Sequence, residues 1–129
     1  MKSMTNYDKV REFHKAFGLD LDEGYNQDIS FLRRNLISEE VYELDSEIVT
    51  SNLKNKLSDN LLKELVDVLY VVYGTAASFG LDIDTAFNRV HESNMSKLDE
   101  DGKPIYRDDG KVLKGPNYEP PVLRDLFDN

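Results

Sequence analysis

The chain has no cysteine, which excludes disulfide scaffolds, thiolate metal sites and cysteine nucleophiles. It is also short of basic residues, because 16 Lys and Arg stand against 25 Asp and Glu and leave a formal charge of −9. Long nucleic acids bind through basic faces, so this balance argues against a nucleic-acid polymer as the partner. A small anionic ligand remains compatible with it where a cation mediates the contact.

Long hydrophobic runs are missing as well. The longest run, Val68 to Tyr73, is far below the ~20 residues that cross a bilayer, and Met1 to Asn6 lack the apolar core of a signal peptide. The 129 residues are 40% hydrophobic and 32% charged, as in one ordinary globular domain. We therefore expect a single domain over residues 1–129 in a soluble, cytoplasmic protein with no membrane partner.

Apolar residues recur at helical spacing through about residues 7–98. The segment Ser51 to Lys56 is expected to be a polar connection. Gly74 is interpreted as a point of close helix packing, and His14 as a packed core or interface histidine. Four helices with short connections predict an all-α four-helix bundle. The expected helices run from Tyr7 to Phe17, from an Asp28 N-cap to about Val49, from Ser58 or Asp59 to Phe79, and from Asp82 or Asp84 to about Leu98.

The remaining segment, about residues 99–129, loses this periodicity and is interrupted by glycine and proline. Two short runs, Lys103 to Arg107 and Lys111 to Lys114, flank Asp108-Asp109-Gly110. Because Asp-Gly is a preferred pair for a tight turn, this pattern predicts a β-hairpin inside an irregular C-terminal extension. A lone hairpin is marginally stable, so it is expected to lie against the bundle or a second subunit.

Several acids occupy positions where apolar residues are expected. On the second helix, with Leu36 set at 0°, Glu40 falls at about +40° and Glu43 at about −20°, inside the apolar face, with Glu39 at its edge. On the third helix, Asp67 interrupts a stretch that is apolar nearly all round, and Glu64 lies one turn earlier. Two facing pairs of this kind would bring four carboxylates together.

Burying carboxylates together is costly unless a cation compensates them, and few basic residues lie on these faces. Oxygen ligands without cysteine favour Mg²⁺, with Mn²⁺ as a possible substitute, over Zn²⁺. The alternative is that these acids only form a solvated helix face. On the metal-site hypothesis the ligands are Glu40, Glu43, Glu64 and Asp67.

The motif Glu39-Glu40-x-x-Glu43 followed by Glu64-x-x-Asp67 resembles the signature of the all-α nucleoside triphosphate pyrophosphohydrolases. This superfamily includes the MazG-like proteins, the dimeric dUTPases and phosphoribosyl-ATP pyrophosphohydrolase. The flanking segments resemble single-domain MazG-like members with a C-terminal extension, namely Val10 to Phe17, Leu32 to Ile37, Val90 to Lys97 and Gly110 to Pro121.

The resemblance implies Mg²⁺-dependent hydrolysis of a nucleoside triphosphate between the α- and β-phosphates, giving a monophosphate and pyrophosphate for nucleotide-pool house-cleaning. It implies catalytic roles for Glu39, which would hold a further ion or position the attacking water, and for Glu40. The candidate substrate-binding residues are Asn94, Lys97, Arg33, His91, Lys114 and Tyr106. Relatives are dimers or tetramers, so a homodimer or homotetramer is expected.

Two alternatives stay open. One keeps the fold and the metal but changes the substrate to phosphoribosyl-ATP; the long segment after Lys97 favours the MazG-like reading over it. The other is a non-catalytic helical bundle that binds a metal or a nucleotide without turnover. The sequence does not distinguish among nucleotides, because base and sugar selectivity depend on the shape of the pocket.

Overall fold

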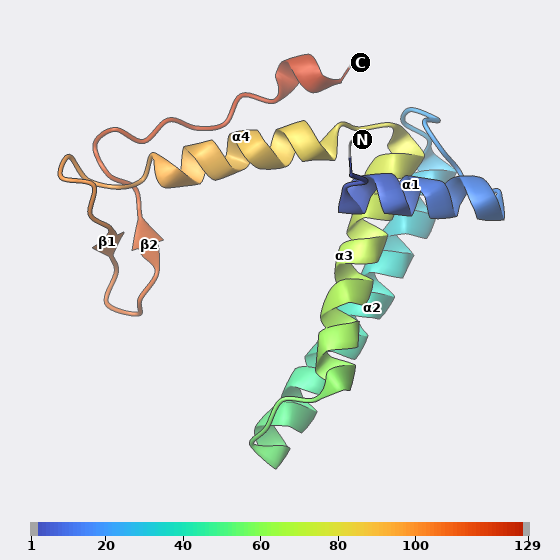
Figure 1. Ribbon diagram of the computed structural model, residues 1–129, viewed down its shortest axis with the longest axis horizontal. Coiled ribbons are helices and arrows are strands. Elements are labelled where there is room, and N and C mark those ends of the chain that lie inside the picture. The colour runs from blue at the N-terminus through green and yellow to red at the C-terminus, as the bar shows by residue number, and fades with distance from the viewer. Residues whose placement is uncertain (1–2, 128–129) are drawn as a thin grey trace. The chain divides into compact units, whose positions relative to one another are not determined.

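A computed structural model describes residues 3–127, so the predicted domain of residues 1–129 extends past this range at both ends. Within this range the chain has four α-helices and one two-stranded hairpin, which confirms the predicted all-α class (Figure 1). It divides into two compact units, Met1–Leu81 and Asp82–Asn129, and each is described by itself. The first unit holds α1 (Asn6–Phe17), α2 (Gln27–Lys54) and α3 (Asp59–Phe79). The second holds α4 (Ile83–Met95), β1 (Ile105–Tyr106), β2 (Val112–Leu113) and the 3₁₀ helix η1 (Arg124–Leu126).

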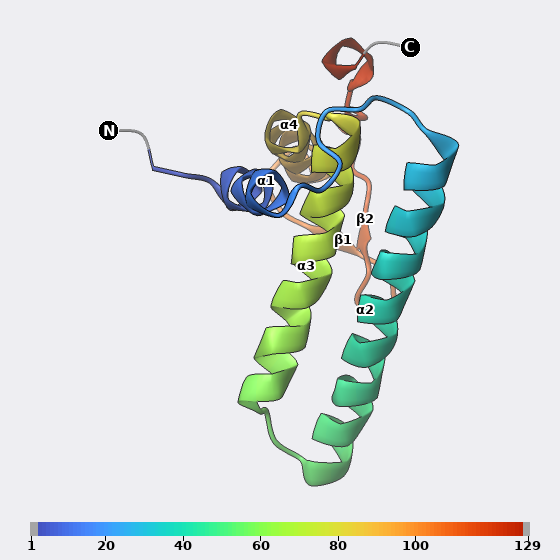
Figure 2. The same ribbon diagram turned by 90° about the vertical axis from the view of Figure 1, so that its right-hand side faces the viewer.

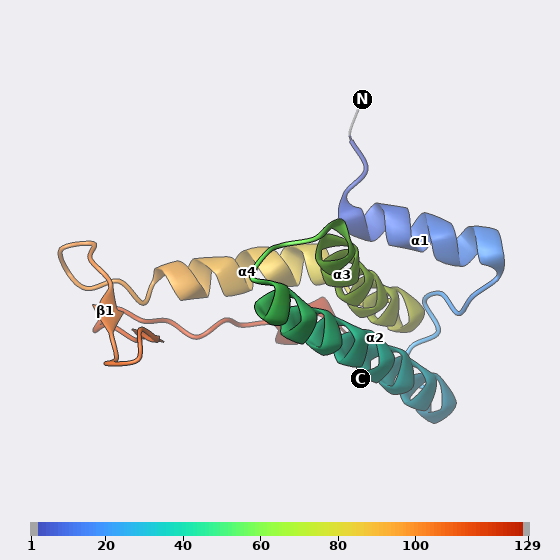
Figure 3. The same ribbon diagram turned by 90° about the horizontal axis from the view of Figure 1, so that it is seen from below.

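Helices α2 and α3 form a long antiparallel hairpin, in which they lie side by side along most of their length (Figures 2 and 3). The helix α3 begins at its Ser58 N-cap and ends before Gly80, as predicted, because Gly80 takes the left-handed conformation with φ of 79°. The connection between the two helices is only four residues, 55–58. This short joint obliges the two helices to pack against each other.

The ends of α2 differ from the prediction. The N-cap is Asn26 rather than Asp28, because the Asn26 side chain accepts the N–H of Ile29, while Asp28 lies in the first turn. The helix also continues through Ser51 to Lys54, so the predicted polar connection at this point is wrong. It ends only where Asn55 adopts a left-handed conformation with φ of 51°.

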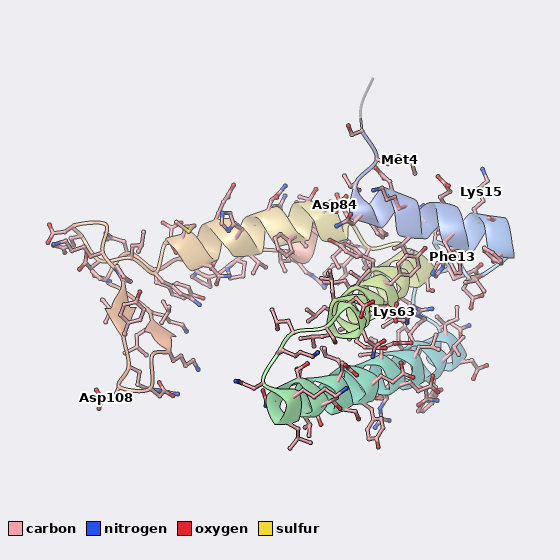
Figure 4. The ribbon with its side chains drawn as sticks, turned by 60° about the horizontal axis from the view of Figure 1, so that its bottom comes forward. Met4, Phe13, Lys15, Lys63, Asp84 and Asp108 are labelled. Carbon is pink, nitrogen blue, oxygen red and sulfur yellow. The ribbon has the colours of Figure 1, made fainter. Side chains whose placement is uncertain are left out.

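Helix α1 packs on α3 through aromatic rings. Tyr7 stacks on Tyr73 with ring centroids 6.2 Å apart, and Phe13 meets Tyr70 edge-on at 5.5 Å. Phe13 projects from α1 towards α3 (Figure 4). The Tyr7 hydroxyl donates to the carbonyl of Leu81, 2.7 Å away, and so ties the start of α1 to the end of α3. Aromatic contacts of this kind add to the free energy of burial.

The helix α4 starts after its Asp82 N-cap, as predicted, but ends at Met95, three residues before the predicted Leu98. Ser96 turns its hydroxyl back to the carbonyl of Ser93, 2.6 Å away, and the chain leaves the helix there. Lys97 was expected on the helix but lies in the turn just beyond it.

The predicted hairpin is confirmed, with strands shorter than the flanking runs suggested. Ile105 pairs with Leu113 and Tyr106 with Val112, and Asp108 lies at the tip (Figure 4). Gly110 has a φ of 90°, which explains the glycine of the turn.

The C-terminal segment lies along α4 within the second unit. The Ser93 hydroxyl donates to the carbonyl of Glu119 at 2.7 Å, and the Glu119 N–H donates to the Ser96 hydroxyl at 2.9 Å. Arg89 forms an ion pair with Asp125 at 2.7 Å. These bonds hold residues 119–125 against the helix.

Among residues 3–127, no single helix is long and apolar enough to cross a membrane. The consecutive helices α3 and α4 reach the length and composition of a membrane span only when they are counted together, although a break separates them.

Candidate metal and active site

The candidate site lies on the seam between α2 and α3. Positions seven residues apart are two helical turns apart on nearly the same face, so Arg33, Glu40 and Glu47 of α2 all face α3. Each of the three has a polar or charged environment on this seam. The interface between α2 and α3 therefore contains charged side chains at positions where a simple helical bundle would have apolar ones.

Three of the four predicted metal ligands converge at the middle of the seam. One carboxylate oxygen each of Glu40, Glu43 and Glu64 lies within 4.8 Å of the other two. Glu64 is buried, Glu40 is half-buried and Glu43 is exposed, so the cluster opens to solvent on the Glu43 side. The Oε2 atoms of Glu40 and Glu64 are buried and accept no hydrogen bond. Two buried carboxylate oxygens without a donor make this group unfavourable unless a cation or protons compensate it.

The fourth predicted ligand, Asp67, is outside this group of three and has a basic partner. Lys63 Nζ lies 2.7 Å from Asp67 Oδ2 and 3.9 Å from Glu64 Oε1. Lys63 lies on α3 and its side chain is 66% exposed (Figure 4). Sequence reasoning missed this lysine, although its spacing of four residues from Asp67 is a recognised helical ion-pair signal.

Two members of the cluster, Glu40 and Glu64, have a pKa raised above the ordinary value of a glutamate. Burial raises the pKa of Glu40 above 4.5, and the nearby charges of Glu43, Asp67 and Glu64 raise it further. Burial also raises the pKa of Glu64, where repulsion by Glu43 and Asp67 acts against the favourable charge of Lys63. The exposed Lys63 therefore relieves only part of the repulsion within the cluster.

These residues fit a hard divalent cation. The ligand atoms are all carboxylate oxygens, which suit Mg²⁺ and Mn²⁺. The two buried oxygens that accept no hydrogen bond are free to bind the cation. Glu39, the other predicted catalytic residue, is exposed on α2 next to Glu40 and is not part of the three-residue group.

Arg33 lies two turns before Glu40 and is only 6% exposed. Its Nη2 donates to the carbonyl of Val71 at 2.9 Å, and its Nε donates to the Thr75 hydroxyl at 3.2 Å. Burial lowers the pKa of Arg33, and the charge of Asp20 opposes this shift. The guanidinium of Arg33 is thus hydrogen-bonded to α3. The substrate contact assigned to Arg33 from the sequence stays a prediction.

The other end of the seam has a polar link that sequence reasoning also missed. Glu47 accepts from the Ser58 hydroxyl at 3.2 Å and from the Asn60 amide at 2.8 Å. Ser58 is also the N-cap of α3. Glu47 therefore joins α2 to the start of α3 next to the short connection.

The other candidate substrate-binding residues belong to the second unit. His91 and Asn94 are exposed one turn apart on α4, and Tyr106 is 60% exposed on β1. The carbonyl of Lys97 accepts the N–H of Gly115 at 2.8 Å, so the backbones at Lys97 and Lys114 come together. The Lys114 ammonium lies 4.7 Å from the centre of the Tyr118 ring.

Known proteins resemble this chain over most of its length. A curated mimivirus protein, uncharacterized protein L479 of Acanthamoeba polyphaga mimivirus, is 32% identical over 117 residues, which are 85% of this chain. The chain spans only 42% of the length of that relative. A solved structure from Exiguobacterium sp. 255-15, provisionally described as an NTP pyrophosphohydrolase, is 27% identical. The match covers 93% of this chain and 90% of that one, with a TM-score of 0.45.

The family profile of phosphoribosyl-ATP pyrophosphohydrolase matches residues 10–94. This match includes α2 and α3 in full and α1 from Val10 onward, and with them every acid of the candidate site. It also reaches His91 and Asn94 on α4. The chain belongs to the phosphoribosyl-ATP pyrophosphohydrolase family.

Proposed function

We propose that the protein hydrolyses a nucleoside triphosphate between its α- and β-phosphates in a reaction that depends on Mg²⁺. The products are a nucleoside monophosphate and pyrophosphate, and the role is nucleotide-pool house-cleaning. The observation that carries the proposal is the convergence of Glu40, Glu43 and Glu64 with two buried oxygens that lack donors. Membership of a pyrophosphohydrolase family supports it.

In this proposal Glu40, Glu43, Glu64 and Asp67 hold the cation. When bound, a divalent cation supplies Lewis acidity and neutralises charge on the polyphosphate. Glu39, exposed beside the cluster, positions the attacking water and accepts its proton. Lys63, which contacts Asp67 and Glu64, keeps the acidic group partly neutralised in the absence of the cation.

The contacts to substrate in this proposal are residues predicted from the sequence. Lys97 and Lys114 bind phosphate oxygens through their ammonium groups, while Asn94 offers both a donor and an acceptor to sugar or base. His91 and Tyr106 complete the set. The cytoplasmic location expected from the sequence stays a prediction.

We also propose that the protein is a homodimer or homotetramer. Large apolar side chains of α3 remain exposed in the single chain, with Val66 at 50% and Leu69 at 52%. Together with Val10, Tyr70 and Tyr73 they line an apolar hollow of about 240 Å³ between α1 and α3. Burial of this surface against another copy would stabilise the assembly. Size-exclusion chromatography with light scattering tests it, and Leu69→Lys is expected to shift the mass towards the monomer.

The activity is tested by measuring pyrophosphate release from a panel of nucleoside tri- and diphosphates with Mg²⁺ or Mn²⁺. We expect release that Glu43→Gln lowers by about 100-fold or more, because a carboxylate ligand is lost. Asp45→Asn, which changes an exposed acid of the same helix, is the matched control. Metal binding without release from any nucleotide would instead identify a non-catalytic module.

A second candidate is hydrolysis of phosphoribosyl-ATP to phosphoribosyl-AMP and pyrophosphate. The family match, which carries this description, favours it. The reaction breaks the same α–β linkage, so the carboxylate site would serve both substrates. Adding phosphoribosyl-ATP to the panel separates the two, since the preferred substrate has the higher kcat/KM.

A further inference from the structure

Arg33 is unusual because its buried guanidinium forms no ion pair, and the charge of Asp20 is the acidic charge that favours its charged form. It is 6% exposed, and among residues 3–127 no carboxylate lies within ion-pair distance of it. Its hydrogen bonds go instead to the Val71 carbonyl and the Thr75 hydroxyl of α3. Burying a charge without a counter-ion in direct contact is costly. A contact retained at such a cost points to a geometric requirement on this part of the seam.

The surroundings of Arg33 are shaped to receive it. A Cβ on Gly74 would overlap Nη2 of Arg33 and lie 3.0 Å from Nε2 of His14, so glycine is what allows the guanidinium to lie against α3. His14 is 2% exposed and is held by a 2.8 Å hydrogen bond from Nδ1 to the Asp20 carbonyl. The guanidinium therefore occupies the space that the missing side chain of Gly74 leaves on α3.

The same register relates this contact to the carboxylate cluster. Arg33 precedes Glu40 by seven residues on α2, and Val71 follows Glu64 by seven residues on α3. In an antiparallel pair, equal steps in opposite directions arrive at facing positions, and seven residues is a rise of about 10.5 Å on each helix. The Arg33–Val71 contact and the Glu40–Glu64 approach are therefore two points of one alignment.

We propose that Arg33 is a positioning residue. Its hydrogen bonds to Val71 and Thr75, for which Gly74 leaves the space, set the register of α2 on α3 that brings Glu40 opposite Glu64. This inference rests on the proposed function only in that the carboxylates hold a divalent cation. It assigns Arg33 a role through the ligands and not through contact with the nucleotide. A slip of α2 along α3 would separate the carboxylates and weaken the binding of the cation.

The test is Mn²⁺ binding to the full chain without nucleotide, measured by calorimetry, alongside steady-state kinetics. Arg33→Gln is expected to weaken Mn²⁺ binding by about 10-fold, as loss of support behind metal ligands does elsewhere. Thr75→Val keeps the side-chain shape but removes one hydrogen bond to Arg33, and is expected to weaken binding by a smaller factor. Arg34→Gln makes the same charge change at the exposed neighbour and is expected to bind as the wild type does.

The outcomes separate the hypotheses. Unchanged Mn²⁺ affinity in Arg33→Gln, with a raised KM and unaltered kcat, would overturn the positioning role and make Arg33 a substrate contact. An equal loss in Arg34→Gln would make the effect one of net charge and would also overturn it. If Arg33→Gln does not fold, Thr75→Val decides. A wild-type chain that binds no Mn²⁺ would refute the proposed metal site itself.

Discussion

Replacing Glu40 by glutamine is expected to stabilise the metal-free protein. One carboxylate oxygen of Glu40 lies within 4.8 Å of a carboxylate oxygen of Glu43 and of one of Glu64. Two unit charges at this distance repel by about 1 kcal/mol with the dielectric constant of water, so the two pairs amount to about 2 kcal/mol. Protonation of Glu40, whose pKa burial raises, and screening by salt reduce this sum. The expected gain in the free energy of unfolding is therefore about 1–2 kcal/mol at pH 7.

The assay is thermal unfolding followed by circular dichroism, first with a chelator and then with Mg²⁺ or Mn²⁺. In chelator, the Glu40→Gln variant is expected to melt about 4 °C above the wild type for each kcal/mol gained. With the cation at 100 times its dissociation constant, the wild type gains about 2.7 kcal/mol. The variant gains less because it has lost a ligand, so the order of the two melting temperatures reverses.

The control is Asp45→Asn, which removes an exposed charge from the same helix. It is expected to unfold as the wild type does in both conditions. A Glu40→Gln variant that is less stable than the wild type in chelator would refute the reasoning. It would show that Glu40 is held by favourable contacts and is not under repulsion from its neighbours.

Three further predictions concern the cluster and the second unit. Because burial raises the pKa of Glu64 above 4.5, the folded state binds more protons than the unfolded chain, so the stability of the metal-free protein is expected to fall as pH rises through the raised pKa; a flat profile, or one that Glu64→Gln leaves unaltered, would contradict this. Gly115→Ala would put a Cβ 2.6 Å from the Lys97 carbonyl oxygen, and chemical denaturation is expected to show a loss of about 1–3 kcal/mol, whereas wild-type stability would show that the segment yields. Ser96→Ala removes the acceptor of the Glu119 N–H, so hydrogen exchange at that amide is expected to accelerate; unchanged exchange would mean that other contacts hold the C-terminal segment.

Local signals in the sequence were enough to place most helix ends. Ser58 and Gly80 bound α3 as expected, because a hydroxyl cap and a left-handed glycine act within one turn of the helix. The ends of α2 were harder to predict, because the local signals there are compatible with more than one position. Asn26 and Asp28 are both competent N-caps, and the polar stretch up to Lys54 is compatible with helix or loop. At such points the choice depends on how α3 packs, which a local pattern does not contain.

The carboxylate cluster was predictable because acids inside an apolar helix face are a strong anomaly. The position of the face itself was less well predicted. Leu32 is 48% exposed whereas Arg33 is buried, so the side of α2 that meets α3 is centred nearer Arg33 and Glu40 than Leu36. This rotation puts Glu40 on the inner side and leaves Glu43 exposed. An arginine on an apolar face is normally assigned to solvent, and no sequence pattern alone would have reversed that assignment.

Gly74 shows why this part of the site needs two helices to be understood together. Alone in α3 it lowers helix stability relative to alanine by about 1 kcal/mol, so helix propensity gives it no purpose. The interpretation of Gly74 as a point of close packing is confirmed, but what it admits is the guanidinium of Arg33 and not an apolar neighbour. The glycine on one helix and the arginine on the other have meaning only in the register that also brings Glu40 to Glu64. Three destabilising features therefore lie on one helix interface: the glycine, the buried charge and the repelling carboxylates. Such a concentration is expected where a protein gives up stability for a binding site.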